Sequence, residues 1–320
     1  MAKKGMARVG EPIRLPDAEP GAAASPSQPY LKRLTALMAF FVLLAMAFGG
    51  VFLELTQYAM RSDLHSHVLL IPFVTAWLIR GRVKDGHVPT RWSSAPGYAM
   101  CCFVLAIAAL SLKVVFAHRG LELHKDDQFS LLIAAVYCLA LAGCALACGR
   151  ETMRTLSFPI AFALLAIPLP IAATEGLERM SQLASAEASS WLFSISGTPV
   201  FREGVIFALP GTVIEVAREC SGIRSSIVLV ITSLIAADLY LRTGWKKALL
   251  VLATFPIGIL RNSIRIFTLA MLSVHVDPAI MKSALHSRGG PLFFALSLLP
   301  LFGLLIWLIK SEATKNSEGK

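Results

Sequence analysis

Long apolar runs recur along this chain between short polar segments, and they restrict it to a fold embedded in lipid. About 20 residues of helix span the hydrocarbon core of a bilayer, so an apolar run of 18 or more residues predicts a transmembrane helix. The expected fold is therefore all-α, a polytopic membrane helix bundle of about eight transmembrane helices. Hydropathy places these spans near residues 34–54, 66–80, 96–117, 129–148, 154–173, 222–241, 246–272 and 291–309.

The remaining segments divide the chain into three parts. Residues 1–30 are rich in Pro and contain four basic residues, which predicts a disordered basic cytoplasmic tail. A transmembrane domain is expected over 31–310, and a short cytoplasmic tail over 311–320. The fifth span should kink or end at its prolines, and the amphipathic stretch 177–196 is expected to lie along the interface or to re-enter the membrane.

The distribution of basic residues orients the bundle, because cytoplasmic loops of membrane proteins are rich in Lys and Arg. With the N-terminus in the cytoplasm, the cytoplasmic segments carry 18 of the 30 Lys and Arg residues. Both termini are then cytoplasmic, and the segments 174–221 and 273–290 lie outside. This pattern explains the net charge of +10 without nucleic acid, which is not an expected partner.

Cys220 is the one cysteine of six in a polar context, Arg-Glu-Cys-Ser-Gly. It lies where the outer segment turns into the sixth span, with Ser221, Gly222 and Arg224 following. The positive end of a helix dipole stabilises a thiolate, and a thiolate is a good nucleophile at neutral pH. The same context also suits an unreactive small residue near a helix start.

Two arginines lie well inside the seventh span, at positions 261 and 265 of Leu-Arg-Asn-Ser-Ile-Arg. Arg261 and Arg265 share one helical face with Asn262 beside it. Placing an arginine at this depth in the membrane costs free energy, so such residues indicate a functional site or a buried partner. In a functional site, a guanidinium could orient a carbonyl or stabilise an oxyanion. The alternative is that they snorkel toward the headgroups.

Two further polar features are less specific. His286 precedes the last span and could act as a general base, but His67, His118, His124 and His275 are also expected outside. An isolated interfacial histidine is as easily an ordinary surface residue. Near the inner end of the sixth span, Asp238 is expected to pair with Arg242, four residues later.

The polar blocks together resemble the exosortase/archaeosortase family. Ala217 to Ser225 resembles its Cys-Ser-Gly block, Asn262 to Arg265 its Asn-x-x-Arg block, and His286 with Gly290 its His-x-x-x-Gly block. Three further blocks match in order, so that the resemblance covers about residues 55 to 305. They are Ser66-His67 with Ile71-Pro72, the Pro-containing span from Phe158 to Pro170, and the stretch from Val200 to Pro210.

The resemblance implies a cysteine protease or transpeptidase of the plasma (cytoplasmic or inner) membrane, with its site on the periplasmic or extracellular side. Cys220 would be the nucleophile, Arg265 the catalytic arginine and His286 the catalytic histidine. Substrate-binding or supporting roles fall to neighbouring residues of the same blocks, namely Asn262, Ser221, Gly222 and Arg224. Arg261 has no secure counterpart in the family and is taken as a supporting residue.

The partners implied are exported proteins that end in a short motif such as Pro-Glu-Pro (PEP-CTERM), an apolar helix and a basic tail, together with membrane lipid and an unknown amine acceptor. No metal or organic cofactor is expected. The alternatives are a non-catalytic membrane factor for extracellular polysaccharide export and a transporter. A transporter would place polar residues along a path to the midplane, whereas the intramembrane charges here gather toward the outer leaflet.

Overall fold

The computed structural model describes residues 28–62, 64–85, 94–210, 212–216, 222–277 and 290–318. The predicted tail 1–30 lies almost wholly outside these residues. The N-terminal part of the described chain is helical throughout. Its elements are α1 (Gln28–Ala47), α2 (Gly49–Arg61), the 3-10 turn η1 (Ser66–Leu69), α3 (Ile71–Lys84), α4 (Pro96–His118), α5 (Lys125–Thr155), α6 (Ser157–Ala163), the 3-10 turn η2 (Leu164–Ala166) and α7 (Ile171–Ile195).

The C-terminal part begins with three short strands and continues with three long helices. These are β1 (Phe201–Glu203), β2 (Ile206–Leu209), β3 (Thr212–Glu215), α8 (Ile223–Tyr240), α9 (Gly244–His275) and α11 (Gly290–Glu318). The strands form an antiparallel sheet in the order β1-β2-β3. The fold is therefore helical except for this small sheet, which the all-α prediction did not include.

Five described helices are long and apolar enough to cross a membrane, and two bent helix pairs raise that number to as many as seven. The five helices are α4, α5, α8, α9 and α11. The bent pairs are α1 with α2, at 64°, and α6 with η2 and α7, at 90°. The predicted span 66–80 instead comprises η1 and α3, and α3 has only 14 residues.

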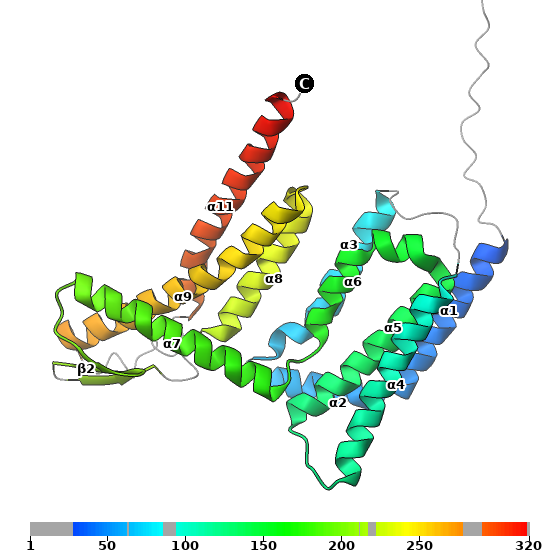
Figure 1. Cartoon of the computed structure of the whole chain (residues 1–320), viewed down its shortest axis with the longest axis horizontal. Coiled ribbons are helices and arrows are strands. Elements are labelled where there is room, and N and C mark those ends of the chain that lie inside the picture. Colours follow the sequence, from blue (N-terminus) through cyan, green and yellow to red (C-terminus); the bar gives the residue numbers. More distant parts are fainter. Residues whose placement is uncertain are drawn as a thin grey trace, which may run out of the picture.

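Prolines end the fifth predicted span, as expected from their missing N–H and fixed φ. After η2 the chain is extended through Pro168 and Pro170 before α7 begins. α7 then runs at 90° to α6, and in Figure 1 it passes below α8 and crosses α9. The predicted amphipathic stretch 177–196 thus lies almost wholly within one helix that turns away from the spans.

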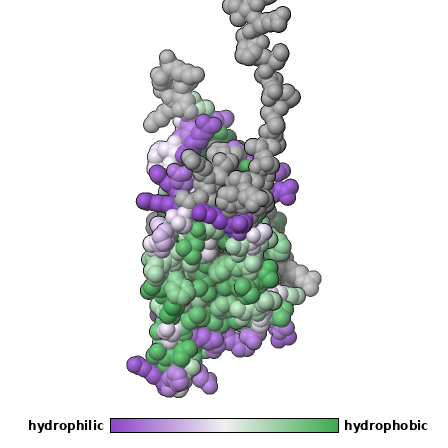
Figure 2. All heavy atoms as spheres, turned by 90° about the vertical axis from the view of Figure 1, so that its right-hand side faces the viewer, coloured by the Kyte–Doolittle hydropathy of each residue, from purple (hydrophilic) through white to green (hydrophobic). Residues whose placement is uncertain are grey.

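Both ends of the described chain lie at the upper end of the molecule in Figure 1, where α1 begins and α11 ends. The end of α3 and the α8–α9 turn lie there too, and these segments carry Arg82, Lys84, Lys246 and Lys247. The α4–α5 connection and the starts of α7 and α8 lie toward the lower end. Figure 2 shows a broad apolar band between a hydrophilic upper and a hydrophilic lower edge. This protein is an integral membrane protein, and we refer to the upper end as the predicted inner end and to the lower end as the predicted outer end.

The predicted inner end is fastened by charged groups between helices. Asp238 of α8 accepts hydrogen bonds from Arg82 of α3 at 2.8 and 2.9 Å and from Lys247 of α9 at 3.2 Å. The expected Asp238–Arg242 pair was wrong, because α8 ends at Tyr240 and Arg242 no longer continues its helical face. Glu312 of α11 instead accepts the backbone N–H groups of Arg242 and Thr243, just before α9 begins.

The sheet packs its inner side on α7 and α9. Phe207 and Leu209 of β2 and Ile214 of β3 are buried, while the intervening side chains point outward. This alternation is the usual consequence of a two-residue repeat in a strand. The cluster is completed by Phe193 of α7 and Ile266 of α9, so the sheet lies beside the half of α9 that carries the predicted arginines.

Candidate active site

Gly222 lies immediately before α8 and adopts φ +72°, the left-handed conformation that only glycine enters without strain. A side chain at this position would also displace the groups that face it from α9. A Cβ built on Gly222 would lie 2.6 Å from Nη2 of Arg261 and 3.2 Å from Oδ1 of Asn262. The backbone conformation therefore favours glycine here, and a larger residue would push the Arg261 guanidinium out of its position.

Arg261 reaches across from α9 to the start of α8. Its Nη2 donates to the carbonyl oxygen of Gly222 at 2.9 Å and to Oγ of Ser226 at 3.3 Å. The same carbonyl accepts the N–H of Ser226 at 2.9 Å. Arg261 is only 5% exposed, so it does not snorkel; it is a buried cation that holds a helix start.

Asn262 and Arg265 complete the arginine-bearing face of α9. Asn262 is 1% exposed and packs against Gly222, and its Nδ2 has no hydrogen-bond partner among the described residues. Arg265 lies one helical turn beyond Arg261 and is half-buried. Arg224, in the first turn of α8, is exposed. The structure thus brings Gly222, Arg261 and Asn262 into contact from two separate sequence blocks.

Three predicted site residues, Cys220, Ser221 and His286, lie outside the described residues. The chain on both sides of the segment 217–221 is described, however. Val216, which precedes it, donates its N–H to the carbonyl of Val205 at 3.0 Å and accepts a hydrogen bond from the Gln182 amide. Gly222, which follows it, is held by Arg261. The two described residues that flank this segment are therefore tied, Val216 to α7 and Gly222 to α9.

α7 and α9 pack through small polar side chains. Ser263 of α9 donates to the carbonyl of Ser185 on α7 at 3.0 Å, and both residues are fully buried together with Ser189. Small residues allow two helix backbones to approach closely, as in helix pairs within membranes. This packing gives Gln182 and Arg261, which lie on the two helices, a defined relative position.

A family model described as a transmembrane exosortase matches residues 59–303. That match covers well over half of the 320-residue chain. The chain belongs to the transmembrane exosortase family. The searches of curated proteins and of solved structures gave no significant match.

The family assignment confirms the resemblance seen in the sequence, over almost the same range. Exosortases are in general membrane cysteine peptidases or transpeptidases that act on exported proteins bearing a sorting signal. In this exosortase the other five cysteines lie on α4 and α5, within apolar helices. None of those five helical positions adjoins the contact between Gly222 and Arg261.

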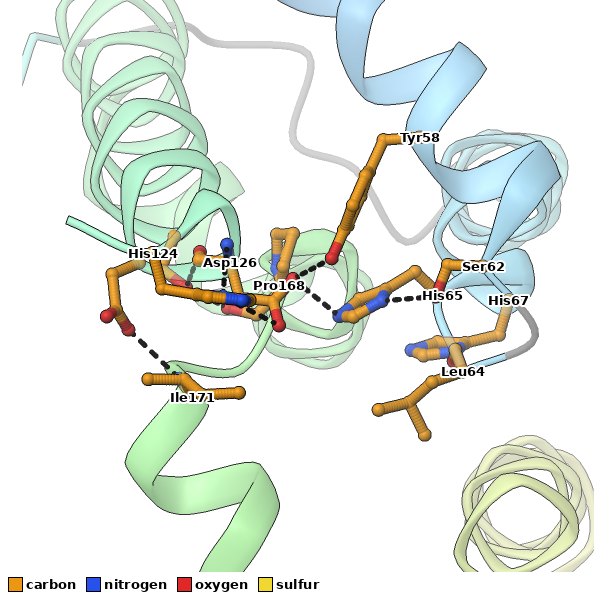
Figure 3. A network of polar contacts seen from close by, with 11 residues as sticks. Tyr58, Ser62, Leu64, His65, His67, His124, Asp126, Pro168 and Ile171 are labelled. Carbon is orange, nitrogen blue, oxygen red and sulfur yellow. Dashed lines mark hydrogen bonds and ion pairs between the residues drawn. The ribbon is translucent and has the colours of Figure 1, made fainter. Parts of the chain in front are cut away.

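A second polar network lies at the predicted outer end of this exosortase, and the sequence reasoning did not anticipate it (Figure 3). Asp126, at the start of α5, accepts the Tyr58 hydroxyl at 2.5 Å, and its Oδ1 lies 3.6 Å from Nε2 of His65. Ser62 Oγ lies 2.9 Å from the other ring nitrogen of His65. Burial lowers the pKa of His65, and the nearby Asp126 carboxylate opposes that shift. No group of three metal-ligating side chains occurs among the described residues, here or elsewhere.

The start of α5 also holds the break between α6 and α7. Ser130 donates to the carbonyl of Pro168 at 2.5 Å, and Asp127 accepts the N–H of Ile171 at 2.9 Å. These contacts fix the first residue of α7, Ile171. Eleven residues further along the same helix, Gln182 donates a hydrogen bond to the carbonyl of Val216. The second network therefore anchors the helix that supports one end of the cysteine segment.

Two signals could have located part of this framework from the sequence. The serines of α7, at positions 185 and 189, share a helical face, which is typical of close helix packing. The carboxylates at 126 and 127 precede a long apolar run, as first-turn residues of a helix often do. The residues on other helices that bond to these serines and carboxylates carry no comparable signal in the sequence.

Proposed function

We propose that this exosortase cleaves the C-terminal sorting signal of exported proteins at the outer face of the membrane, through a thioester on Cys220. The observation that supports this most strongly is the contact between the Cys-Ser-Gly and Asn-x-x-Arg blocks. Arg261 and Asn262 lie against Gly222, and only Ser221 separates Cys220 from Gly222 in the chain. Two chain steps span at most about 7 Å, which supports a position for the cysteine within reach of the arginine-bearing face of α9.

The reaction follows from the groups assigned to the site. The Cys220 thiolate attacks the carbonyl carbon of the scissile peptide bond and forms a C–S bond, while the carbonyl oxygen becomes an oxyanion that Arg265 stabilises. His286 gives a proton to the leaving amine as the C–N bond breaks. An amine acceptor or water then attacks the thioester, and the thiolate leaves.

The start of α8 favours the ionised nucleophile. Helix N-termini carry a partial positive charge that lowers the pKa of a nearby thiol. α8 begins three residues after Cys220 and ends at the predicted inner end, so its positive end faces the outer side. Arg261 and Arg265 add positive charge from α9.

The substrate would be an exported protein whose tail consists of a short motif such as Pro-Glu-Pro, an apolar helix and basic residues. The apolar helix would lie beside the spans, and the basic tail would remain at the predicted inner end. This arrangement brings the motif to the level of the start of α8.

Reporter cleavage tests the proposal. A reporter with such a tail is co-expressed with the wild-type protein, with Cys220→Ala and with Cys148→Ala, and cleavage is followed by the size of the reporter. We expect cleavage by the wild type and by Cys148→Ala, which replaces a buried cysteine of α5, and none by Cys220→Ala. Normal cleavage by Cys220→Ala would refute the thioester mechanism.

A further inference from the structure

Asn262 is a buried polar residue whose amide donor finds no partner among the described residues. Its side chain is 1% exposed, and its Nδ2 has no hydrogen-bond partner among the described residues. Nη1 of the adjacent Arg261 is likewise buried without a described partner. A buried donor without an acceptor is costly, so such a group is a candidate for bonding to another molecule.

Both residues lie at the start of α8. Asn262 packs on Gly222, which immediately precedes the helix, with Oδ1 at 3.2 Å from the position that a Cβ of residue 222 would take. Arg261 uses Nη2 for the Gly222 carbonyl and Ser226, which fixes the guanidinium, and its Nη1 has no partner among the described residues. The helix start, the amide and the guanidinium are all hydrogen-bond donors, so an oxygen that carries negative charge would suit each of them.

We propose that the Asn262 amide binds the oxygen of the scissile carbonyl and stabilises it as an oxyanion, and that Arg261 is the positioning residue which holds Asn262 and the start of α8 together. This inference rests on the proposed function. It adds a side-chain donor to the oxyanion stabilisation assigned to Arg265. Burial suits the role, because an oxyanion donor is most effective where water is excluded.

The expected kinetic signature is a loss of cleavage without a loss of thiol reactivity. Asn262→Leu keeps the approximate size of the side chain and removes the donor, so reporter cleavage should fall about 10²- to 10³-fold, as for other single oxyanion donors. Asn262→Ser keeps a hydroxyl donor and should retain at least about ten times the activity of Asn262→Leu, a difference of about 1.4 kcal/mol in the barrier. Ser273→Ala is the matched control, since Ser273 is another buried polar residue of α9 without a described partner.

Cys220 reactivity is measured separately, as the rate of alkylation by iodoacetamide in a full-length protein whose other five cysteines are alanine. Asn262→Leu should leave this rate within about twofold, because the amide acts on the carbonyl and not on the thiol. Wild-type cleavage by Asn262→Leu, or an alkylation rate reduced in proportion to cleavage, would overturn the inference. If Asn262→Leu does not accumulate in membranes, the comparison of Asn262→Ser with Asn262→Ala decides, and equal cleavage by the two would overturn it. Cleavage that persists in Cys220→Ala would instead refute the proposed function, so the two failures are distinct.

Discussion

Arg261 donates a 2.9 Å hydrogen bond to the carbonyl oxygen of Gly222, 39 residues earlier in the chain. This bond joins the glycine of the Cys-Ser-Gly block to the residue that immediately precedes the Asn-x-x-Arg block. A side chain at Gly222 would displace the Arg261 guanidinium, and Arg261 is itself buried. The relationship therefore constrains both residues at once, and it can be tested from either side.

From the side of α8, Gly222→Ala should abolish reporter cleavage. The substitution places a Cβ 2.6 Å from Nη2 of Arg261 and adds about 1–2 kcal/mol of backbone strain at positive φ. Gly204→Ala separates the two effects, because Gly204 has φ +59° but open space around it. We expect Gly204→Ala to lower the thermal stability in detergent and to retain cleavage. Equal cleavage by both variants would show that the contact with Arg261 is unimportant.

From the side of α9, Arg261→Met should reduce cleavage at least about tenfold and lower the unfolding temperature moderately. A hydrogen bond from a charged group is worth about 1.5–3 kcal/mol, and its loss releases the start of α8. The Gly222 carbonyl still accepts the N–H of Ser226, so no acceptor is left unsatisfied. Arg179→Met, an exposed change on α7, is the control and should cleave normally. Cleavage by Arg261→Met at the wild-type rate would contradict this assignment.

Much of this site could be predicted because its residues are chemically unusual for their surroundings. Arg261 and Arg265 are charged residues in an apolar helix. Burying a charge in the membrane is energetically unfavourable, so such residues usually have a functional or structural role. The structure confirms a buried partner for Arg261 and excludes snorkelling for that residue. Ser226 could not be predicted, because a serine inside a helix carries no signal that an arginine from another helix reaches it.

Asp238→Asn should destabilise the bundle by roughly 1–3 kcal/mol, because it weakens charge-assisted hydrogen bonds whose cationic partners are about a third exposed. The Asp238 side chain is 4% exposed and is contacted by both Arg82 and Lys247, which the change would leave without their anion. The measurement is denaturant or thermal unfolding in detergent. Arg242→Gln is the matched control, because Arg242 is exposed and does not contact Asp238; it should shift the free energy of unfolding by less than about 0.5 kcal/mol. Equal effects of the two changes would contradict the observed pairing.

His65 should make the folded state less stable as the pH falls. Burial lowers its pKa in the folded protein below the ordinary 6.5, with Asp126 opposing the shift. The unfolded chain then binds the proton more readily, so the stabilisation is complete above about pH 6.5 and is lost as the pH falls through the lower folded pKa. His65→Gln should flatten this part of the profile of unfolding temperature against pH. An unchanged profile in His65→Gln would show that His65 does not titrate between the two states.

The small sheet and the second network show where sequence reasoning ends. The segment 201–215 is too short and too mixed to be distinguished from an irregular loop, and its strands form because Phe207 and Ile214 find a buried surface on α7 and α9. Asp126 and His65 lie 61 positions apart, and only the packing of α2 on α5 brings them together. Hydropathy was sufficient to predict that the long helices exist. The 90° turn into α7 could not be predicted, because it depends on the contact between the residues after the prolines and the start of α5.

The central claim is that Cys220 carries the substrate as a thioester, and trapping that adduct tests it most directly. The wild-type protein and the reporter are acid-quenched during cleavage, and the covalent complex is digested and analysed by mass spectrometry. We predict the N-terminal part of the reporter on the peptide that contains Cys220, through a bond that neutral hydroxylamine cleaves. A reporter adduct on any other residue, or an adduct that persists in Cys220→Ala, would contradict the account.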